Sequence, residues 1–212
     1  KVFILKDGQV AVSTIAGPDA KFEVSLTGLT GGNYSFSVYG QDDKGAKSGL
    51  FTFSVYITPG STIKVSDIFI PPTIAVDKSE VKQGDNIVIF GKSNPNSDVT
   101  ISVHSNTEIF NKVRSDNSGS YLYNFDTSPL EKGQHVTKSK VGTGSELSSF
   151  SEPISFVVGT KNVPIVLTNS LKGDLNNDKK VNLVDFSIAA FWYKKNLTAV
   201  FKSIEKDRLN GD

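Results

Sequence analysis

The sequence predicts a mainly β protein in which two β-sandwiches in tandem are followed by a small helical domain. Short runs of alternating apolar and polar residues, separated by Gly, Asn, Asp and Pro turns, fill residues 1–159. These runs recur at a spacing near 100 residues, which suits tandem sandwiches better than a short-repeat solenoid. After residue 172 the apolar spacing becomes that of a helix.

Composition narrows the functional classes. The 212 residues are 37% hydrophobic and 21% charged, so packed cores are feasible. A formal net charge of +1, from 23 basic and 22 acidic side chains, argues against nucleic-acid binding and against a membrane-surface helix. The chain has no cysteine, which excludes disulfides and thiolate sites. The longest apolar stretch, Ile188 to Tyr193, is far short of the roughly 20 residues that span a bilayer.

The first predicted sandwich covers residues 1–71. Residues 22–26, 34–38 and 51–55 each alternate apolar with polar side chains, as strands with one buried and one solvated face do. Asp7-Gly8 lies between two such runs and favours a tight hairpin. Residues 63–70 are expected to pair as a further strand.

The second predicted sandwich, residues 72–159, repeats the first. Residues 1–5 align with 98–102, and residues 51–55 align with 154–158. About 25 residues precede Asp98 in the second copy, including the apolar run 87–90, and they have no counterpart in the first. Together with the absence of methionine, this predicts a fragment whose first sandwich is N-terminally truncated and lacks two strands.

A linker and a helical domain are predicted next. Residues 160–171 are expected to form an extended linker, because Pro164 opposes a helix there. Val184, Ile188, Phe191 and Trp192 follow the i, i+4, i+7, i+8 spacing of an amphipathic helix. Residues 197–208 suggest a second short helix.

The segment between the linker and the helix has the spacing of a twelve-residue calcium loop. Ca²⁺ prefers six to eight oxygen ligands, and oxygen donors occupy positions 1, 3, 5, 7, 9 and 12. Lys179 stands at position 6, where glycine normally makes the sharp turn, so weakened binding is expected. The alternative is an Asp- and Asn-rich surface turn that binds no metal. The predicted ligands are Asp174, Asn176, Asp178, the Lys180 carbonyl, Asn182 through a water, and Asp185.

Residues 173–186 resemble the first loop–helix unit of a dockerin, and residues 209–212 resemble the start of the second. The resemblance implies a dockerin-like domain over residues 172–212, C-terminally truncated, that holds Ca²⁺ and binds a cohesin-like module. Loop positions 10 and 11 and the following helix would make that contact, although we expect most of the aromatic side chains to pack in the core. The implied docking residues are Leu183, Val184, Phe191, Trp192, Lys194 and Lys195.

The sandwich region has its own resemblance. Residues 92–103 and 125–128 are similar to bacterial immunoglobulin-like repeats of surface proteins, which implies spacer or adhesive modules in an exported chain. The expected architecture is therefore tandem immunoglobulin-like β-sandwiches followed by a dockerin-like calcium-loop domain. The expected function is that of a non-enzymatic fragment of a bacterial cell-surface or secreted protein.

Two alternatives stay open. One is a carbohydrate-binding accessory module of a secreted polysaccharide-degrading enzyme, for which Tyr39 and Tyr56 are the candidate sugar-stacking residues. The other is a purely structural stalk. His104 and His135 are the only histidines; both are expected on the solvated surface, and neither is placed as a base beside a nucleophile. No catalytic residue is therefore predicted.

Overall fold

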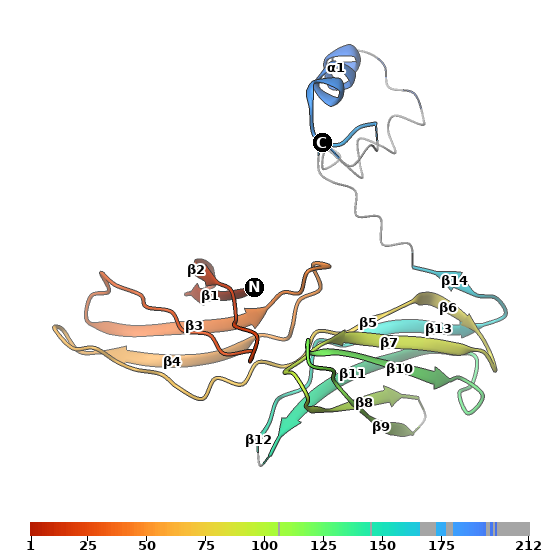
Figure 1. Ribbon diagram of the computed structural model, residues 1–212, viewed down its shortest axis with the longest axis horizontal. Helices are drawn as coiled ribbons and strands as arrows, with labels where there is room; N and C mark the ends of the chain where they lie inside the picture. Colours follow the sequence, from red (N-terminus) through yellow and green to blue (C-terminus); the bar gives the residue numbers. More distant parts are fainter. Residues whose placement is uncertain are drawn as a thin grey trace. The chain divides into compact units, whose positions relative to one another are not determined.

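The computed structural model describes residues 1–105, 107–144, 146–165, 173–176, 180–193, 196 and 198. The chain divides into two compact units, residues 1–165 and 166–212. The first unit contains both sheet repeats, and the second contains the helix α1 (Leu183–Trp192) (Figure 1). The chain is therefore mainly β, with one short helix among its described residues.

The first repeat is a single antiparallel sheet. Its strands are β1 (Val2–Lys6), β2 (Gln9–Thr14), β3 (Gly32–Gly40) and β4 (Phe51–Ile57), in the order β2-β1-β3-β4. The predicted hairpin is confirmed: Asp7 and Gly8 join β1 to β2 with φ of 50° and 83°, the positive values that a two-residue hairpin turn needs. Val2, Ile4, Phe36 and Val38 are buried on one face of the sheet.

Two predicted strands of the first repeat are absent. Residues 22–26 and 63–70 belong to no strand. Phe22, Val24 and Leu26 are nevertheless half-buried against the core of the repeat, and so is Ile68. Alternation thus predicted correctly which side chains face inward. It could not predict the missing hydrogen bonds, because pairing depends on a neighbouring strand.

The second repeat has two sheets that enclose a core. One sheet has the order β10-β7-β5; the other has the order β14-β6-β13-β11-β8-β9, with β12 paired to β11. All the pairings are antiparallel except that of β6 with β13, which is parallel. The strands are β5 (Ala75–Val76), β6 (Lys78–Lys82), β7 (Asn86–Lys92), β8 (Asp98–His104), β9 (Glu108–Arg114), β10 (Ser120–Asp126), β11 (Gly133–Thr143), β12 (Glu146–Leu147), β13 (Ile154–Gly159) and β14 (Val163–Pro164).

The structure contains the repeat that the sequence predicts. The order β2-β1-β3-β4 corresponds to β9-β8-β11-β13, and every pairing in both sets is antiparallel. A serine makes the same contacts in each copy. Ser48 donates its backbone N–H to the Gly40 carbonyl at 2.8 Å and accepts from the Gly40 N–H at 2.9 Å. Ser148 does the same with Val141, at 2.9 and 3.0 Å.

The segment predicted as a linker begins with a strand. Val163 and Pro164 form β14, which pairs antiparallel with β6, so residues 160–165 belong to the first compact unit. Proline is compatible with this position because β14 is the edge strand of its sheet. Residues 166–172 lie outside the described residues.

The expectation of a solvated His135 is wrong, whereas His104 is exposed as expected. His135 is only 5% exposed, because it occupies an inward position of β11, two residues before the buried Thr137. Its Nε2 lies 2.8 Å from the Glu131 carbonyl, and its ring packs 5.7 Å from that of Phe156. His135 is therefore a core residue.

The helix predicted from the apolar spacing is confirmed as α1. The second predicted helix, residues 197–208, falls outside the described residues except for Thr198. Within the ranges that the structure describes, no helix is both long and apolar enough to cross a membrane.

Replacing Tyr121 by Phe should destabilise the second repeat by about 1 kcal/mol at neutral pH. The Tyr121 hydroxyl donates to the Thr73 carbonyl at 2.6 Å and lies 2.9 Å from the Ser139 hydroxyl. Burial raises the pKa of Tyr121. Because the folded-state pKa lies above the unfolded value of about 10, stability should be lost as the pH rises past that value.

Urea unfolding at pH 7 and near pH 11 checks this prediction. Tyr121→Phe should be less stable than the parent at pH 7 and should lose less stability on going to alkaline pH. Parallel losses in the parent and the variant would contradict the role assigned to the phenol.

Candidate metal centre

The predicted calcium loop lies in the second compact unit, where residues 173–176 and 180–193 are described. Its first residues are tightly packed: Asp174 is 2% exposed and Leu175 is 4% exposed. Gly173 precedes them with φ of 88°, a left-handed conformation that favours glycine. A buried carboxylate needs a compensating partner, so the burial of Asp174 marks the start of the loop as a site of interaction.

Asp185 joins the two ends of the loop. Its Oδ1 accepts from the backbone N–H of Leu175 at 2.7 Å and of Asn176 at 3.3 Å. Its Oδ2 accepts from the backbone N–H of Asn182 at 2.9 Å. The side chain is only 2% exposed. The hydrogen bond from Asn182, together with those from Asn176 and Leu175, lowers the pKa of Asp185 against the opposing effect of burial, so the group is held as a carboxylate.

The start of helix α1 is fixed by the same residues. Asn182 is the N-cap, with extended backbone angles, and its side chain accepts from the Val184 N–H at 2.8 Å. Asp185 at the third helical position completes a capping box. Sequence reasoning assigned Asn182 and Asp185 only to the metal and missed this second role. The spacing Asn-x-x-Asp directly before an apolar run was the available signal.

The described residues fit a calcium ion in part. Asp174 and Asp185, from positions 1 and 12, are both buried, and Asp185 is hydrogen-bonded to the two residues that follow Asp174. Asn176 and Lys180, from positions 3 and 7, are exposed. Asp178 lies outside the described residues, as does Lys179. Among the residues that are described, no three His, Asp or Glu side chains come together.

The predicted docking residues lie on or beside α1. Leu183 is 81% exposed, Val184 52% and Phe191 57%. Trp192 is partly buried, and its ring meets that of Phe191 edge-on at 5.2 Å. The expectation that most of these aromatic side chains pack in the core is wrong for Phe191, because α1 is apolar on most of its circumference and cannot bury every face. Lys194 and Lys195 lie outside the described residues.

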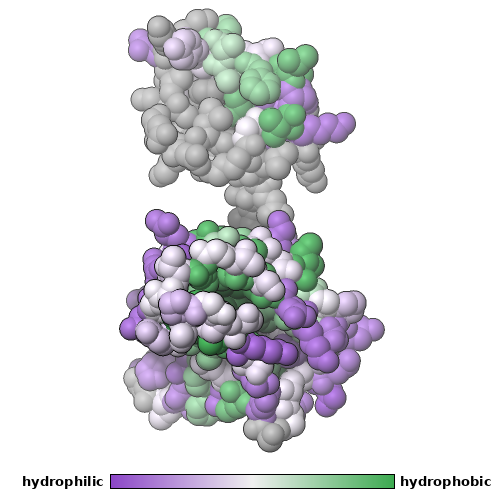
Figure 2. Space-filling view, turned by 90° about the vertical axis from the view of Figure 1, so that its left-hand side faces the viewer, coloured by the Kyte–Doolittle hydropathy of each residue, from purple (hydrophilic) through white to green (hydrophobic). Residues whose placement is uncertain are grey.

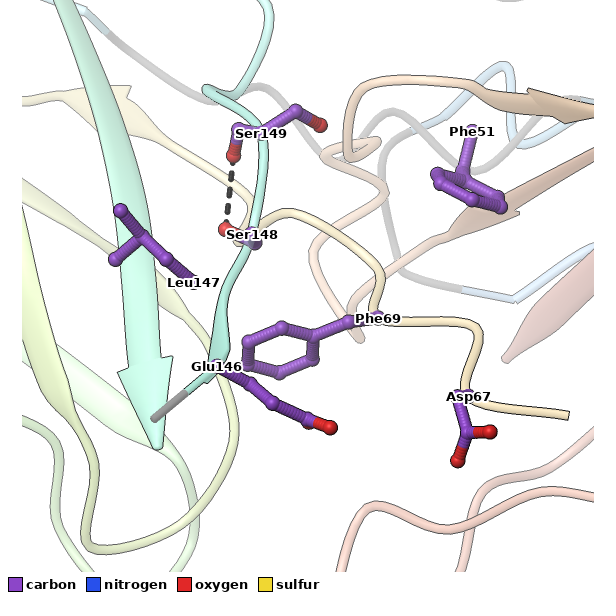
Figure 3. Close-up of a pocket in the computed structure, with 7 residues that line it drawn as sticks. All are labelled: Phe51, Asp67, Phe69, Glu146, Leu147, Ser148 and Ser149. Carbon is purple, nitrogen blue, oxygen red and sulfur yellow. Dashed lines mark hydrogen bonds between the residues drawn. The ribbon is translucent and has the colours of Figure 1, made fainter. Parts of the chain in front are cut away.

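A small cavity of about 380 Å³ occurs in the first unit and carries no recognisable chemistry. Figure 3 shows the Phe69 ring beside the Glu146 side chain, with Asp67 beyond it. The Ser148 hydroxyl accepts from the Val141 N–H at 3.0 Å and donates to the Ser149 carbonyl at 2.8 Å, so it already has both an acceptor and a donor partner. No histidine accompanies these serines among the described lining residues, and no activated nucleophile is assembled.

The candidate sugar-stacking residues do not form a flat platform. Tyr39 stacks face to face on Phe3, with ring centroids 4.9 Å apart and 9° between the planes. Lys47 lies 5.4 Å from the Tyr39 ring centroid. Tyr56 is 65% exposed on β4. A carbohydrate-binding platform needs an open ring face, and the Tyr39 ring is already in contact with Phe3 and Lys47.

No protein-family model matches the sequence, and a search of curated proteins finds no significant relative. Three solved structures have low similarity to the chain. The interferon gamma receptor alpha chain of chicken is 12% identical over 59% of this chain, with a TM-score of 0.33. A tetra-tandem repeat from the extending region of a large adhesion protein is 17% identical over 76%, with a TM-score of 0.35. The D00-D0 domain of intimin is 16% identical over 74%, with a TM-score of 0.33.

The matches span 66% of the receptor chain, 42% of the adhesion-protein chain and 78% of the intimin chain. The chain thus covers less than two thirds of the first two. Scores this low assign neither a fold family nor a function, so the functional case depends on the chain's own residues.

Proposed function

We propose that residues 174–185 bind Ca²⁺ and that the loop with helix α1 is a dockerin-like attachment module. The observation that carries the proposal is the Asp185 carboxylate, which is buried and hydrogen-bonded to Leu175 and Asn182 at both ends of the loop. Asp174 is also buried, and its neighbour Leu175 is hydrogen-bonded to Asp185, so a hard cation bound by the loop would offset the charges of two buried carboxylates.

The ligands come from the loop itself. Asp174, Asn176 and Asp178 would supply side-chain oxygens, Lys180 its carbonyl, Asn182 a bridging water, and Asp185 the closing carboxylate. The ion would supply charge neutralisation and rigidity, with no chemical step. This chain's own contribution is to hold Asp185 ionised, through three backbone hydrogen bonds that lower its pKa, and to begin α1 directly after the loop.

The sheet repeats are proposed to be immunoglobulin-like spacer or adhesive modules of a bacterial surface or secreted protein without enzymatic activity. Their support is the tandem sheet order and the matching serine contacts of Ser48 and Ser148. The attachment partner is proposed to be a cohesin-like module. The exposed apolar side chains of Leu183, Val184 and Phe191 support a protein partner, because exposed apolar patches commonly mark such surfaces.

Calcium should stabilise the second unit, and Trp192 should report it. Trp192 is the only tryptophan of the chain and lies at the end of α1. A ligand that binds only the folded state stabilises that state by about 2.7 kcal/mol when its free concentration is 100-fold above Kd. We expect a higher melting midpoint for the Trp192 fluorescence transition of the 212-residue chain with calcium than with chelator, and a smaller effect with Mg²⁺.

Two variants sharpen this measurement. Asp174→Ala should remove most of the calcium effect. Lys179→Gly should strengthen binding about fivefold, the equivalent of the roughly 1 kcal/mol that a side chain costs at a left-handed turn position. Identical Trp192 melts with calcium and with chelator in the parent chain would refute the metal site.

A further inference from the structure

The first repeat has a core that is covered on one side only. Its single hydrogen-bonded sheet buries four hydrophobic residues, and eleven others are only partly buried against them. The second repeat, with two sheets, buries fourteen, and five others are partly buried. The two repeats share the order of four strands, but among the described residues only the second has another sheet, β10-β7-β5, facing those strands. The smaller number of fully buried residues in the first repeat therefore reflects the lack of a facing sheet.

Residues 22–29 lie where the second sheet of the first repeat would be. Their side chains alternate, with Phe22, Val24 and Leu26 half-buried and Glu23 and Ser25 exposed. Within the described part of the chain, none of residues 22–29 makes a backbone–backbone hydrogen bond. The segment is therefore an extended edge with unpaired N–H and carbonyl groups, the form that accepts an added strand.

The second repeat shows which strand covers the equivalent edge. Residues 22–26 align with β10, in which Tyr121 and Phe125 are buried. There, β10 pairs antiparallel with β7 over seven residue pairs, Phe125 standing opposite Ile87. Ile87 and Ile89 of β7 are completely buried in that core. In the first repeat, the described residues supply no strand at this place.

A cavity and an apolar hollow adjoin the uncovered side. The cavity has a volume of about 730 Å³, and its lining includes Phe22, Ile68 and Ile70 of the first repeat together with Lys92, Pro95 and Ser118 of the second, so Phe22 is the residue of 22–28 that borders it. Figure 2 views the molecule from the side of the first repeat and shows hydrophobic atoms at the bottom of a hollow with a more polar rim. Phe22, Val24 and Leu26 of the core are only partly buried and so keep some surface exposed.

We propose that residues 22–28 form an acceptor edge that binds an extended strand with the chemistry of β7. The occupant is a polypeptide segment from outside residues 1–212. It runs antiparallel to residues 22–28, with β-branched apolar side chains at the alternate positions that face Val2, Ile4 and Val38. Its backbone pairs with the unpaired edge, and its inward side chains complete the core. The acceptor edge is independent of the calcium loop.

A peptide with the sequence of residues 85–93, which includes β7, is the probe. It is titrated into the 212-residue chain while amide hydrogen exchange is followed. Residues 22–28 should exchange rapidly in the free chain and at least tenfold more slowly with saturating peptide. A peptide with both inward isoleucines, Ile87 and Ile89, replaced by Asn should not protect them. A peptide with the outward Val88 replaced by Thr should still do so.

Matched variants of the chain test the same edge. Val24→Asp, on the half-buried side, should abolish protection by the peptide, whereas Ser25→Asp, on the exposed side, should retain it. Protection of the β3 and β4 amides in the same experiment shows whether each chain variant is folded. The altered peptides test the same edge in the unaltered chain, where misfolding of a variant plays no part.

Three results would overturn the proposal. One is rapid exchange of residues 22–28 at every peptide concentration. Another is slow exchange without peptide in the dilute chain, which would mean that the edge is already paired. The third is protection that rises with the concentration of the chain itself, which would identify a second copy as the occupant.

Discussion

Asp185→Asn should weaken calcium binding about 100-fold, because the charge and number of carboxylate ligands set the affinity of such loops. The replacement is isosteric, but one of its oxygens becomes an NH₂ group that faces backbone N–H groups. The contacts to Leu175 and Asn182 cannot then both be kept. The Trp192 transition should therefore melt at a lower temperature even with chelator present. Calorimetric titration and Trp192 fluorescence measure the two effects.

The loss of stability at acid pH is a second test of the Asp185 carboxylate. The pKa of Asp185 is lowered in the folded chain, first by the hydrogen bond from Asn182. The stability it contributes is therefore present above its unfolded pKa of about 4 and is lost as the pH falls through the lowered folded value. Asp185→Asn should remove this part of the acid dependence of the Trp192 transition.

Asp126→Asn is the matched control. Asp126 accepts from the Ser128 N–H at 2.8 Å, and its pKa is likewise lowered by hydrogen bonds from Ser128. It lies on β10 in the other compact unit, so the same change of charge there should leave calcium binding unaltered. Equal losses of affinity in the two variants would show that net charge, and not the loop, determines the binding.

Phe156→Ala should destabilise the second repeat by about 3 to 5 kcal/mol. Phe156 is 1% exposed on β13 and packs in the fourteen-residue core beside His135. Truncation would leave a cavity between two sheets that cannot close without breaking strand pairs. The melting temperature followed by far-ultraviolet circular dichroism should fall by roughly 10 °C, at about 2 to 4 °C for each kcal/mol.

Phe110→Ala makes the same truncation on an exposed site. Phe110 lies on β9 and is 56% exposed, so its removal should change the free energy of unfolding by no more than about 0.5 kcal/mol. A comparable loss in both variants would mean that the packing around Phe156 does not hold the two sheets together.

Period-two alternation predicted the sheet repeats well because it reports which side chains face a core. The inward residues of β3 and β8 follow directly from it, and the offset near 100 residues corresponds to the shared strand order. The apolar run at residues 87–90 was recognised as a strand of the second copy with no counterpart in the first, and it is β7. Local pattern was sufficient for these longer strands, each of which has a partner strand.

Strand pairing and burial that depend on residues distant in sequence could not be predicted from period-two alternation. Residues 22–26 have a strand pattern but no neighbour with which to pair, and β14 is too short to show a period. His135 looked like a surface residue because it is polar and close to a turn, yet its carbonyl partner and the Phe156 ring accommodate it in the core. In each case the deciding contact lies across the sheet or the core.

The calcium site itself stays a prediction from spacing. Asp174 and Asp185, the first and last predicted ligands, are both buried. The capping contacts of Asn182 were missed because the same residue had already been given a metal role. The exposure of Phe191 was missed because a helix with apolar residues on most faces does not indicate which face is covered.

The parallel pairing of β6 with β13 determines how the second repeat bears tension. In sequence, β6 lies near the start of the repeat and β13 near its end. The two strands pair through Val157–Glu80, Val158–Val81 and Gly159–Lys82. A pull on the two ends draws the strands past each other, so all of their hydrogen bonds are loaded at once. The antiparallel pair of β14 with β6 opens one bond at a time from its end. A stretched chain therefore lengthens first by releasing β14, while the sandwich behind it remains closed.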